Sequence, residues 1–156
     1  MEQNIKQFNI RVYGIIINER NELLLADEYQ LGMKMTKFPG GGLKFGEGTI
    51  DCLKREAFEE FGQELDVTAH FYTLDYFQPA LFYKSYQLLC IYYLARFKEP
   101  VQFKISTQPF DGRDNVNEGF QSFRWKNLDL LSQKDLTLPV DKKVLGMITS
   151  RFAKNE

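Results

Sequence analysis

A glycine-rich loop is followed at once by a short acidic helix in the first half of this chain. The segment KFPGGGLKFGEG, residues 37–48, contains a proline and a run of glycines that regular helix does not tolerate. Thr49 then stands where it can cap a helix that runs to Phe61 and ends at Gly62. The residues that share one narrow arc at about 100° per residue, and are therefore expected to face the core, are Ile50, Leu53, Ala57 and Phe61.

Runs rich in β-branched and aromatic residues lie on both sides of this loop and helix. The ranges 8–18 and 22–29 flank a turn, and we expect them to form a hairpin. The ranges 66–78 and 85–98 are expected to form a second pair. A last strand is expected in the first part of 120–131. Residues 139–152 predict a closing helix. Strands interleaved with two main helices indicate the α/β class, with a central mixed sheet covered by helices on its faces.

Length and charge set the expected number of domains and limit the class of partner. With 156 residues the chain has the size of one domain, so we expect a single domain over residues 1–156. The 20 Lys and Arg residues against 21 Asp and Glu residues leave a formal net charge of -1. This balance gives no global attraction to nucleic acid or to an anionic membrane, so an anionic small molecule would have to be held locally.

The cysteines and the amino-terminal sequence bear on the compartment. Cys52 and Cys90 are too few and too isolated for a disulfide framework, and they fit buried thiols in a reducing environment. The first residues lack the pattern of a signal peptide, and no apolar run approaches the roughly 20 residues of a membrane span. We therefore expect a cytoplasmic protein that does not associate with a membrane.

Three glutamates crowd one side of the predicted helix. Glu56, Glu59 and Glu60 lie within an arc of about 100° that adjoins the apolar stripe. Like charges at i,i+3 and i,i+4 each destabilise an isolated helix by about 0.2–0.5 kcal/mol. Solvation of a surface helix is one explanation for the cluster, and a compensating cation is the other.

The spacing around these glutamates resembles the Nudix box. That motif is a glycine, five residues, a glutamate, seven residues, and then arginine, glutamate, an aliphatic residue, any residue, two glutamates, any residue, glycine and an aliphatic residue. Its fixed letters match Gly41, Glu47, Arg55, Glu56, Glu59, Glu60 and Gly62. The chain departs from the motif at Gln63, where the pattern has an aliphatic residue, and this departure removes no chemical group.

The resemblance implies a fold and a class of reaction. The Nudix fold is an α/β/α sandwich with a central mixed sheet, and its members hydrolyse a nucleoside diphosphate linked to another group. Water attacks one phosphorus of a pyrophosphate, and Mg²⁺ or Mn²⁺ neutralises charge on the attacked and leaving groups. The substrate classes left open are nucleoside triphosphates, nucleotide sugars, ADP-ribose and dinucleoside polyphosphates. The same resemblance is compatible with a homodimer.

The resemblance also implies roles for the residues of the motif. Glu56, Glu59 and Glu60 are the implied metal carboxylates, and the general base is expected among them, with Glu59 and Glu56 as candidates. Glu47 and Arg55 are implied to form an ion pair that ties the loop to the helix.

Further members of the site are implied outside the helix. A backbone carbonyl of Gly40 or Gly41 is implied as a metal ligand, since glycines allow close backbone approach. Glu118 lies in the polar segment 106–119 and is similar to a loop glutamate that often supplies a ligand or base in this family. A glutamate kept for solubility in an exposed loop is the alternative, and Asp114 is the next candidate.

Two other classes of function are consistent with the residues. A Nudix-fold sensor or regulator would bind a nucleotide without turnover, although it would not need the full set of metal carboxylates. A structural domain with a solvated acidic helix would require the motif to be accidental. Metal-dependent hydrolysis that EDTA abolishes distinguishes the enzyme from both alternatives.

Overall fold

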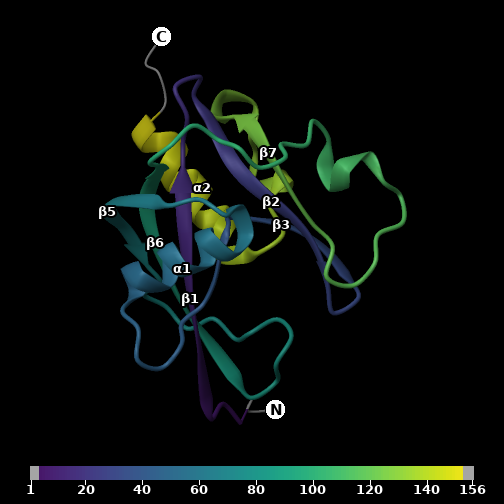
Figure 1. The fold of residues 1–156 in the computed structure, drawn as a ribbon. Coiled ribbons are helices and arrows are strands. Elements are labelled where there is room, and N and C mark those ends of the chain that lie inside the picture. Colours follow the sequence, from purple (N-terminus) through teal and green to yellow (C-terminus); the bar gives the residue numbers. More distant parts are fainter. Residues whose placement is uncertain (1–3, 153–156) are drawn as a thin grey trace. The chain divides into compact units, whose positions relative to one another are not determined.

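The computed structural model describes residues 4–152 of the chain (Figure 1). Its strands are β1 (Gln7–Ile16), β2 (Glu22–Gln30), β3 (Met33–Lys37), β4 (Gly40–Gly42), β5 (Leu65–Thr73), β6 (Tyr86–Phe97) and β7 (Gln121–Asn127). Its helices are α1 (Thr49–Phe61) and α2 (Pro139–Phe152), with 3₁₀ turns η1 (Pro109–Gly112), η2 (Leu128–Leu130) and η3 (Gln133–Asp135). The expected α/β class is confirmed. Within residues 4–152, no helix has the length and apolar character needed to cross a membrane.

The chain divides into two compact units, and each unit is built from two separate stretches of sequence. The first unit is Met1–Gly14 with Gly40–Val101, and it holds most of β1 together with β4, α1, β5 and β6. The second unit is Ile15–Pro39 with Gln102–Glu156, and it holds β2, β3, β7 and α2. The whole motif segment, residues 41–63, therefore lies in the first unit.

The sheet of the first unit has the strand order β4-β1-β6-β5. The short strand β4 runs antiparallel to β1, with Gly41 opposite Val12. β5 and β6 also pair antiparallel, so the expected pairing of the ranges 66–78 and 85–98 is confirmed. β5 ends at Thr73, earlier than expected, where the Asp75 carboxylate accepts a hydrogen bond from the Tyr72 hydroxyl at 2.9 Å. Aspartate is unfavourable in strands, and it outweighs the aromatic residues that follow it.

Helix α1 ends at Phe61 as expected, because Gly62 marks its end. The expectation that Thr49 caps the helix is wrong: Thr49 is the first helical residue, its hydroxyl bonds to that of Tyr93, and the N-cap is Gly48. Gly62 has a φ of 66°, and its N–H donates to the carbonyl of Phe58, which is the left-handed cap that glycine adopts without strain. The exit of the helix is held by Gln63, which is buried and donates from Nε2 to the carbonyl of Pro100 at 3.0 Å. The amide at the position where the motif has an aliphatic residue is thus satisfied by a backbone acceptor.

The apolar face of α1 differs from the expected stripe at one position. The side chains buried there are Cys52, Leu53, Ala57 and Phe61. The prediction for Ile50 is wrong, since this residue is 43% exposed. A helical wheel gives the direction of a side chain but not its position along the helix axis. The side chain of Ile50, in the first turn, is not covered by other residues.

The sheet of the second unit has the order β3-β2-β7, with both pairs antiparallel. The expected hairpin of the ranges 8–18 and 22–29 is wrong, because β1 and β2 belong to different sheets. The expected turn persists as a single bridge, Ile17 opposite Leu23. β2 pairs instead with β3 across a turn in which Leu31 and Gly32 have φ values of 53° and 73°. β3 was missed because its sequence, MKMTK, has little β-branched or aromatic character.

Helix α2 has the bounds that the sequence predicts, and it holds Phe38, which precedes Pro39 and the run of glycines. Its buried side chains are Val140, Asp141, Val144, Leu145 and Ile148. Asp141 is fully buried and accepts a hydrogen bond from the amide of Phe38, itself fully buried, at 3.4 Å. The backbone is thereby fixed just before Pro39.

Candidate active site

The two glycines that lead into the motif are required for different reasons. A Cβ atom on Gly41 would lie 2.2 Å from Cδ of Glu56, so the carboxylate of α1 rests directly on the backbone of β4. A Cβ atom on Gly40 would lie 2.1 Å from the carbonyl oxygen of Val12, and Gly40 has a φ of 151°. Gly41 is thus needed for the approach of a side chain, and Gly40 for the packing of one backbone on another.

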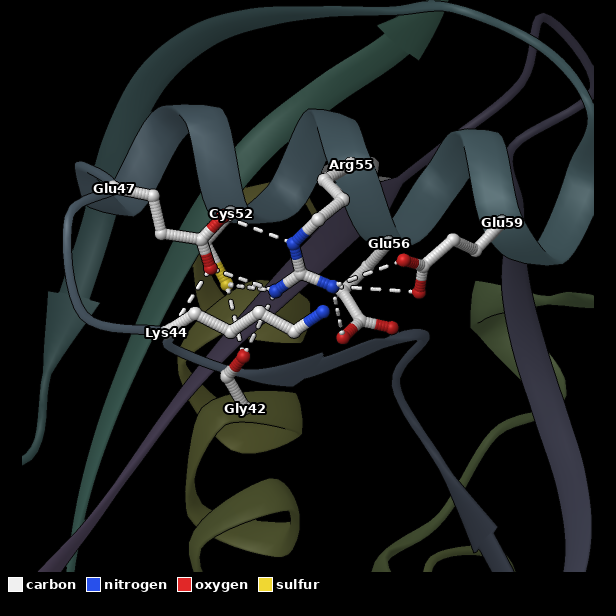
Figure 2. A network of polar contacts seen from close by, with 7 residues as sticks. All are labelled: Gly42, Lys44, Glu47, Cys52, Arg55, Glu56 and Glu59. Carbon is white, nitrogen blue, oxygen red and sulfur yellow. Dashed lines mark hydrogen bonds and ion pairs between the residues drawn. The ribbon is translucent and has the colours of Figure 1, made fainter.

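Arg55 on α1 is the centre of a polar network (Figure 2). Its Nη2 donates to Oε1 of Glu47 at 2.7 Å and its Nε donates to Oε2 of the same carboxylate at 2.9 Å. Nη2 also donates to the carbonyl of Gly42 at 3.0 Å. The bidentate pair joins the loop to the helix, and the hydrogen bond to the Gly42 carbonyl joins β4 to the same guanidinium.

The same guanidinium also neutralises part of the acidic face of the helix. Nη1 of Arg55 lies 3.0 Å from Oε1 of Glu56 and 3.3 Å from Oε2 of Glu59. Figure 2 shows the two carboxylates on one side of the cation and Glu47 on the other. A single arginine thus offsets the repulsion that the glutamate cluster creates.

The glutamates of the cluster differ in their exposure. The side chain of Glu56 is 16% exposed, whereas that of Glu59 is 52% exposed and open to water. Glu60 is half-buried, and its Oε2 atom is fully buried. The three carboxylates therefore offer oxygen atoms from the protein interior to the solvent along one helix.

The charges of the network shift the pKa values of its members. The hydrogen bond from Arg55 lowers the pKa of Glu47 from 4.5 to about 2, and the same pair raises the pKa of Arg55 above its ordinary value. Burial raises the pKa of the Cys52 thiol to about 12, so this residue stays protonated. Its sulfur lies 3.5 Å from the carbonyl of Gly42. Cys52 is thus a packed neighbour of the network and not a thiolate ligand.

The donor set fits a hard divalent cation, although the side chains are not gathered around one point. Among residues 4–152, no three Asp, Glu, His or Cys side chains come together in an arrangement that would hold a metal ion. Nη1 of Arg55 contacts the carboxylates of both Glu56 and Glu59 instead. Carboxylate oxygens beside a glycine backbone are nevertheless the ligands that Mg²⁺ and Mn²⁺ prefer.

Glu118 lies in the second unit, where its carboxylate contacts the β2–β3 turn. It accepts hydrogen bonds from the amides of Leu31 and Gly32, the second at 3.3 Å. Asp114 is tied to the same hairpin, since its carbonyl accepts from Nζ of Lys34 at 3.0 Å. These contacts attach the segment 106–119 to the end of the hairpin.

Sequence reasoning missed the part of the network that depends on backbone groups. The amide of Lys44 donates to Oε1 of Glu47 at 2.8 Å, and the carbonyl of Gly42 accepts from Arg55. The third glycine of the run, Gly42, was the only residue type that could have indicated these contacts. The hydrogen bonds of backbone groups cannot be predicted from the types of the side chains.

Comparison with known proteins places these observations in a family. The model of the NUDIX domain matches residues 7–145 of the chain. The chain belongs to the Nudix family. Nudix hydrolases cleave pyrophosphate bonds and generally use a divalent metal, so the expectation of a hydrolase of this kind is confirmed. A search of curated proteins finds no match.

Solved structures with the Nudix fold resemble the chain over nearly its whole length. A NUDIX hydrolase from Nitrosomonas europaea is 18% identical with a TM-score of 0.67, and the match covers 92% of this chain and 89% of that one. The ORF135 protein of E. coli is 19% identical with a TM-score of 0.67, covering 95% and 96%. The MutT protein from Methanosarcina mazei Go1 is 17% identical with a TM-score of 0.66, covering 96% and 98%. These likenesses confirm the Nudix fold, an α/β fold with a mixed sheet and two helices.

Proposed function

We propose that this Nudix protein hydrolyses a pyrophosphate bond in a nucleoside diphosphate linked to another group, and that the reaction depends on Mg²⁺ or Mn²⁺. The observation that carries the proposal is the motif 41–63 with all seven of its fixed residues, in which Arg55 holds Glu47, Glu56 and Glu59 through one guanidinium. The substrate classes proposed are nucleoside triphosphates, nucleotide sugars, ADP-ribose and dinucleoside polyphosphates.

The residues proposed to hold the cation are the carboxylates of the helix and the backbone of the glycine run. They are Glu56, Glu59, Glu60 and a carbonyl of Gly40 or Gly41. When bound, a divalent cation lowers the pKa of a coordinated water and neutralises phosphate charge. The contact of Glu56 with the backbone of Gly41 supports this assignment, because it brings carboxylate and main chain together.

The general base is assigned to Glu59 on the grounds of exposure. A base must reach the attacking water, and the side chain of Glu59 is 52% exposed while that of Glu56 is 16% exposed. Arg55 holds the two carboxylates and the loop in place, so its role is positioning. Glu118 stays a prediction as a further ligand or base, with Asp114 as the second candidate.

The match of the NUDIX domain spans stretches of both compact units, which supports the proposal that residues 1–156 form a single domain. A cytoplasmic location and a homodimer stay predictions.

An activity assay tests the proposed function. Release of phosphate, pyrophosphate and nucleoside monophosphate is measured from a panel of the four substrate classes, with Mg²⁺ or Mn²⁺ and with an EDTA control. We expect turnover of one class that EDTA abolishes and that Glu60→Gln lowers by at least about 10²-fold. Glu99→Gln, which alters an exposed carboxylate outside the motif, is the matched control and retains full turnover. Stabilisation by a nucleotide without turnover would indicate a sensor and overturn the proposal.

A further inference from the structure

A cavity of about 350 Å³ lies in the first unit, along α1 and the start of β5. Its lining residues are Lys54, Arg55, Phe58, Glu64, Leu65 and Lys98. The only member shared with the polar network of the motif is Arg55. The cavity is therefore built mainly from residues that the proposed hydrolysis does not use.

The apolar part of the cavity suits a flat ring. Leu65 is buried, with 1% of its surface exposed, whereas Phe58 is 63% exposed. Phe58 occupies the position of the motif where any residue is accepted, so the motif gives no reason for an aromatic side chain there. An exposed aromatic ring beside a buried leucine offers a face on which a planar heterocycle can stack.

The polar part of the cavity suits an anion. Lys54 and Lys98 contribute positive charge against the one carboxylate of Glu64. The charge of Arg55 is already offset by the carboxylates of the motif. Nζ of Lys98 lies 3.3 Å from Oε2 of Glu64, but the two side chains are 43% and 71% exposed, and an ion pair in contact with water is weak. Among the described residues, Lys54 has no ion-pair partner. The two lysines can therefore turn to a bound phosphate at little cost.

We propose that this cavity is a binding site for a mononucleotide, with the base on Phe58 and the phosphate between Lys54 and Lys98. Its volume is at the lower end of the roughly 300–1,000 Å³ of small-molecule pockets, as a ligand of one base and one phosphate requires. The proposal goes beyond the proposed hydrolysis and does not depend on it, because none of its contacts requires a metal ion.

Binding of adenosine monophosphate to the full chain in EDTA tests the proposal. EDTA removes divalent cations, so this binding test does not depend on the metal-dependent hydrolysis. The binding proposal can therefore fail while the proposed hydrolysis holds, and the reverse. We expect saturable binding, followed by amide NMR shifts, that maps to residues of α1 and β5 lining the cavity. Adenosine alone and inorganic phosphate alone should bind at least about tenfold more weakly, because each lacks one half of the contacts. Equal binding of phosphate alone, shifts that map elsewhere, or no saturation would overturn the proposal.

Matched variants test the two halves of the site. Phe58→Ala and Lys98→Ala should each weaken the binding of adenosine monophosphate by about fivefold or more. Phe8→Ala and Lys84→Ala, which remove exposed side chains of the same types outside the cavity, should leave it unchanged. Circular dichroism checks that each variant is folded, and Lys98→Ala carries the test if Phe58→Ala does not fold. Unchanged binding in either cavity variant would overturn the proposal.

Discussion

Gly41 and Gly40 are neighbours, yet a methyl group on each would meet a different kind of obstacle. At Gly41 the obstacle is the end of the Glu56 side chain, which can rotate away. At Gly40 it is the carbonyl of Val12 and the backbone of Tyr13, which cannot move without shifting the sheet. The same substitution should therefore affect function at one position and stability at the other.

Gly41→Ala should lower turnover by about 10²-fold, because it displaces the Glu56 carboxylate by more than an ångström, with little loss of stability. Gly40→Ala should lower the free energy of unfolding by about 2 kcal/mol or more through backbone strain and overpacking. Thermal unfolding and hydrolysis rates of both variants check the pair. Equal loss of stability in the two variants would contradict this assignment.

The Glu47 carboxylate should make stability depend on pH. Its pKa is lowered from 4.5 to about 2 in the folded protein, so the stability it contributes is fully present above about pH 4.5. That contribution is lost as the pH falls from about 4.5 to about 2. The difference in melting temperature between the wild type and Glu47→Gln should shrink across this window, as measured by thermal unfolding from pH 7 to pH 2.5. Glu99→Gln is the control, and a Glu47→Gln difference that is constant with pH would contradict the prediction.

The motif placed some residues of the network by spacing alone, and it left others out. The motif implies Glu47 and Arg55 as a pair, and Nη2 of Arg55 lies 2.7 Å from Oε1 of Glu47 in the structure. The carbonyl of Gly42 and the amide of Lys44 join the same network without a side-chain signal. Backbone groups are present at every residue, so only the folded chain shows which of them are used.

At the scale of elements, the sequence predicts both bounds of α2 and the end of α1, although the cap of α1 is Gly48 and not Thr49, and it predicts the strands less exactly. The helices carry local signals, namely apolar periodicity, a glycine at the end of α1 and a proline at the start of α2. Strand partners depend on residues far away in the chain, so the range 22–29 was paired with the wrong neighbour. Five residues were likewise assigned to a strand beyond Thr73 because aromatic content does not show where a strand ends.

Alanine should lower the stability of the protein at Gly62, which follows α1, and raise it at Gly146, which lies inside α2. Gly62 has a φ of 66° and no atom within 4 Å of an added Cβ, so Gly62→Ala carries a conformational cost alone, about 1 kcal/mol. Gly146 lies inside α2, where an added Cβ meets Gln133 at an ordinary 3.8 Å, so Gly146→Ala should stabilise by about 1 kcal/mol. Melting temperatures should fall and rise by about 2–4 °C, respectively. A fall in both would show that α2 does not tolerate the methyl group.

The β2–β3 hairpin should depend on Glu118. Glu118→Ala removes the acceptor of two turn amides, those of Leu31 and Gly32, and should lower the free energy of unfolding by about 1 kcal/mol. Hydrogen exchange at the two amides should accelerate. Glu118→Gln keeps one acceptor oxygen and should fall between the wild type and Glu118→Ala. Exchange at both amides that is unchanged in Glu118→Ala would show that the turn is stable without the carboxylate.

At the scale of the whole molecule, the two compact units are interleaved in the sequence, and the chain passes between them more than once. The first unit is interrupted by residues 15–39, and these join the second unit. Neither unit is one continuous stretch of the chain, so neither can form without the chain passing through the other. This arrangement is why we expect a single cooperative domain.

The chain carries a separate natural probe in each unit. Cys52 and Cys90 are buried thiols of the first unit, and Trp125, the only tryptophan, belongs to the second. If residues 1–156 form one domain, thiol reactivity and tryptophan fluorescence should report the same unfolding midpoint in urea. Cys90→Ser and Cys52→Ser, measured singly, show whether either thiol alone follows the first unit. Midpoints that differ between the two probes would mean that the units unfold separately, since each probe then follows the stability of its own unit.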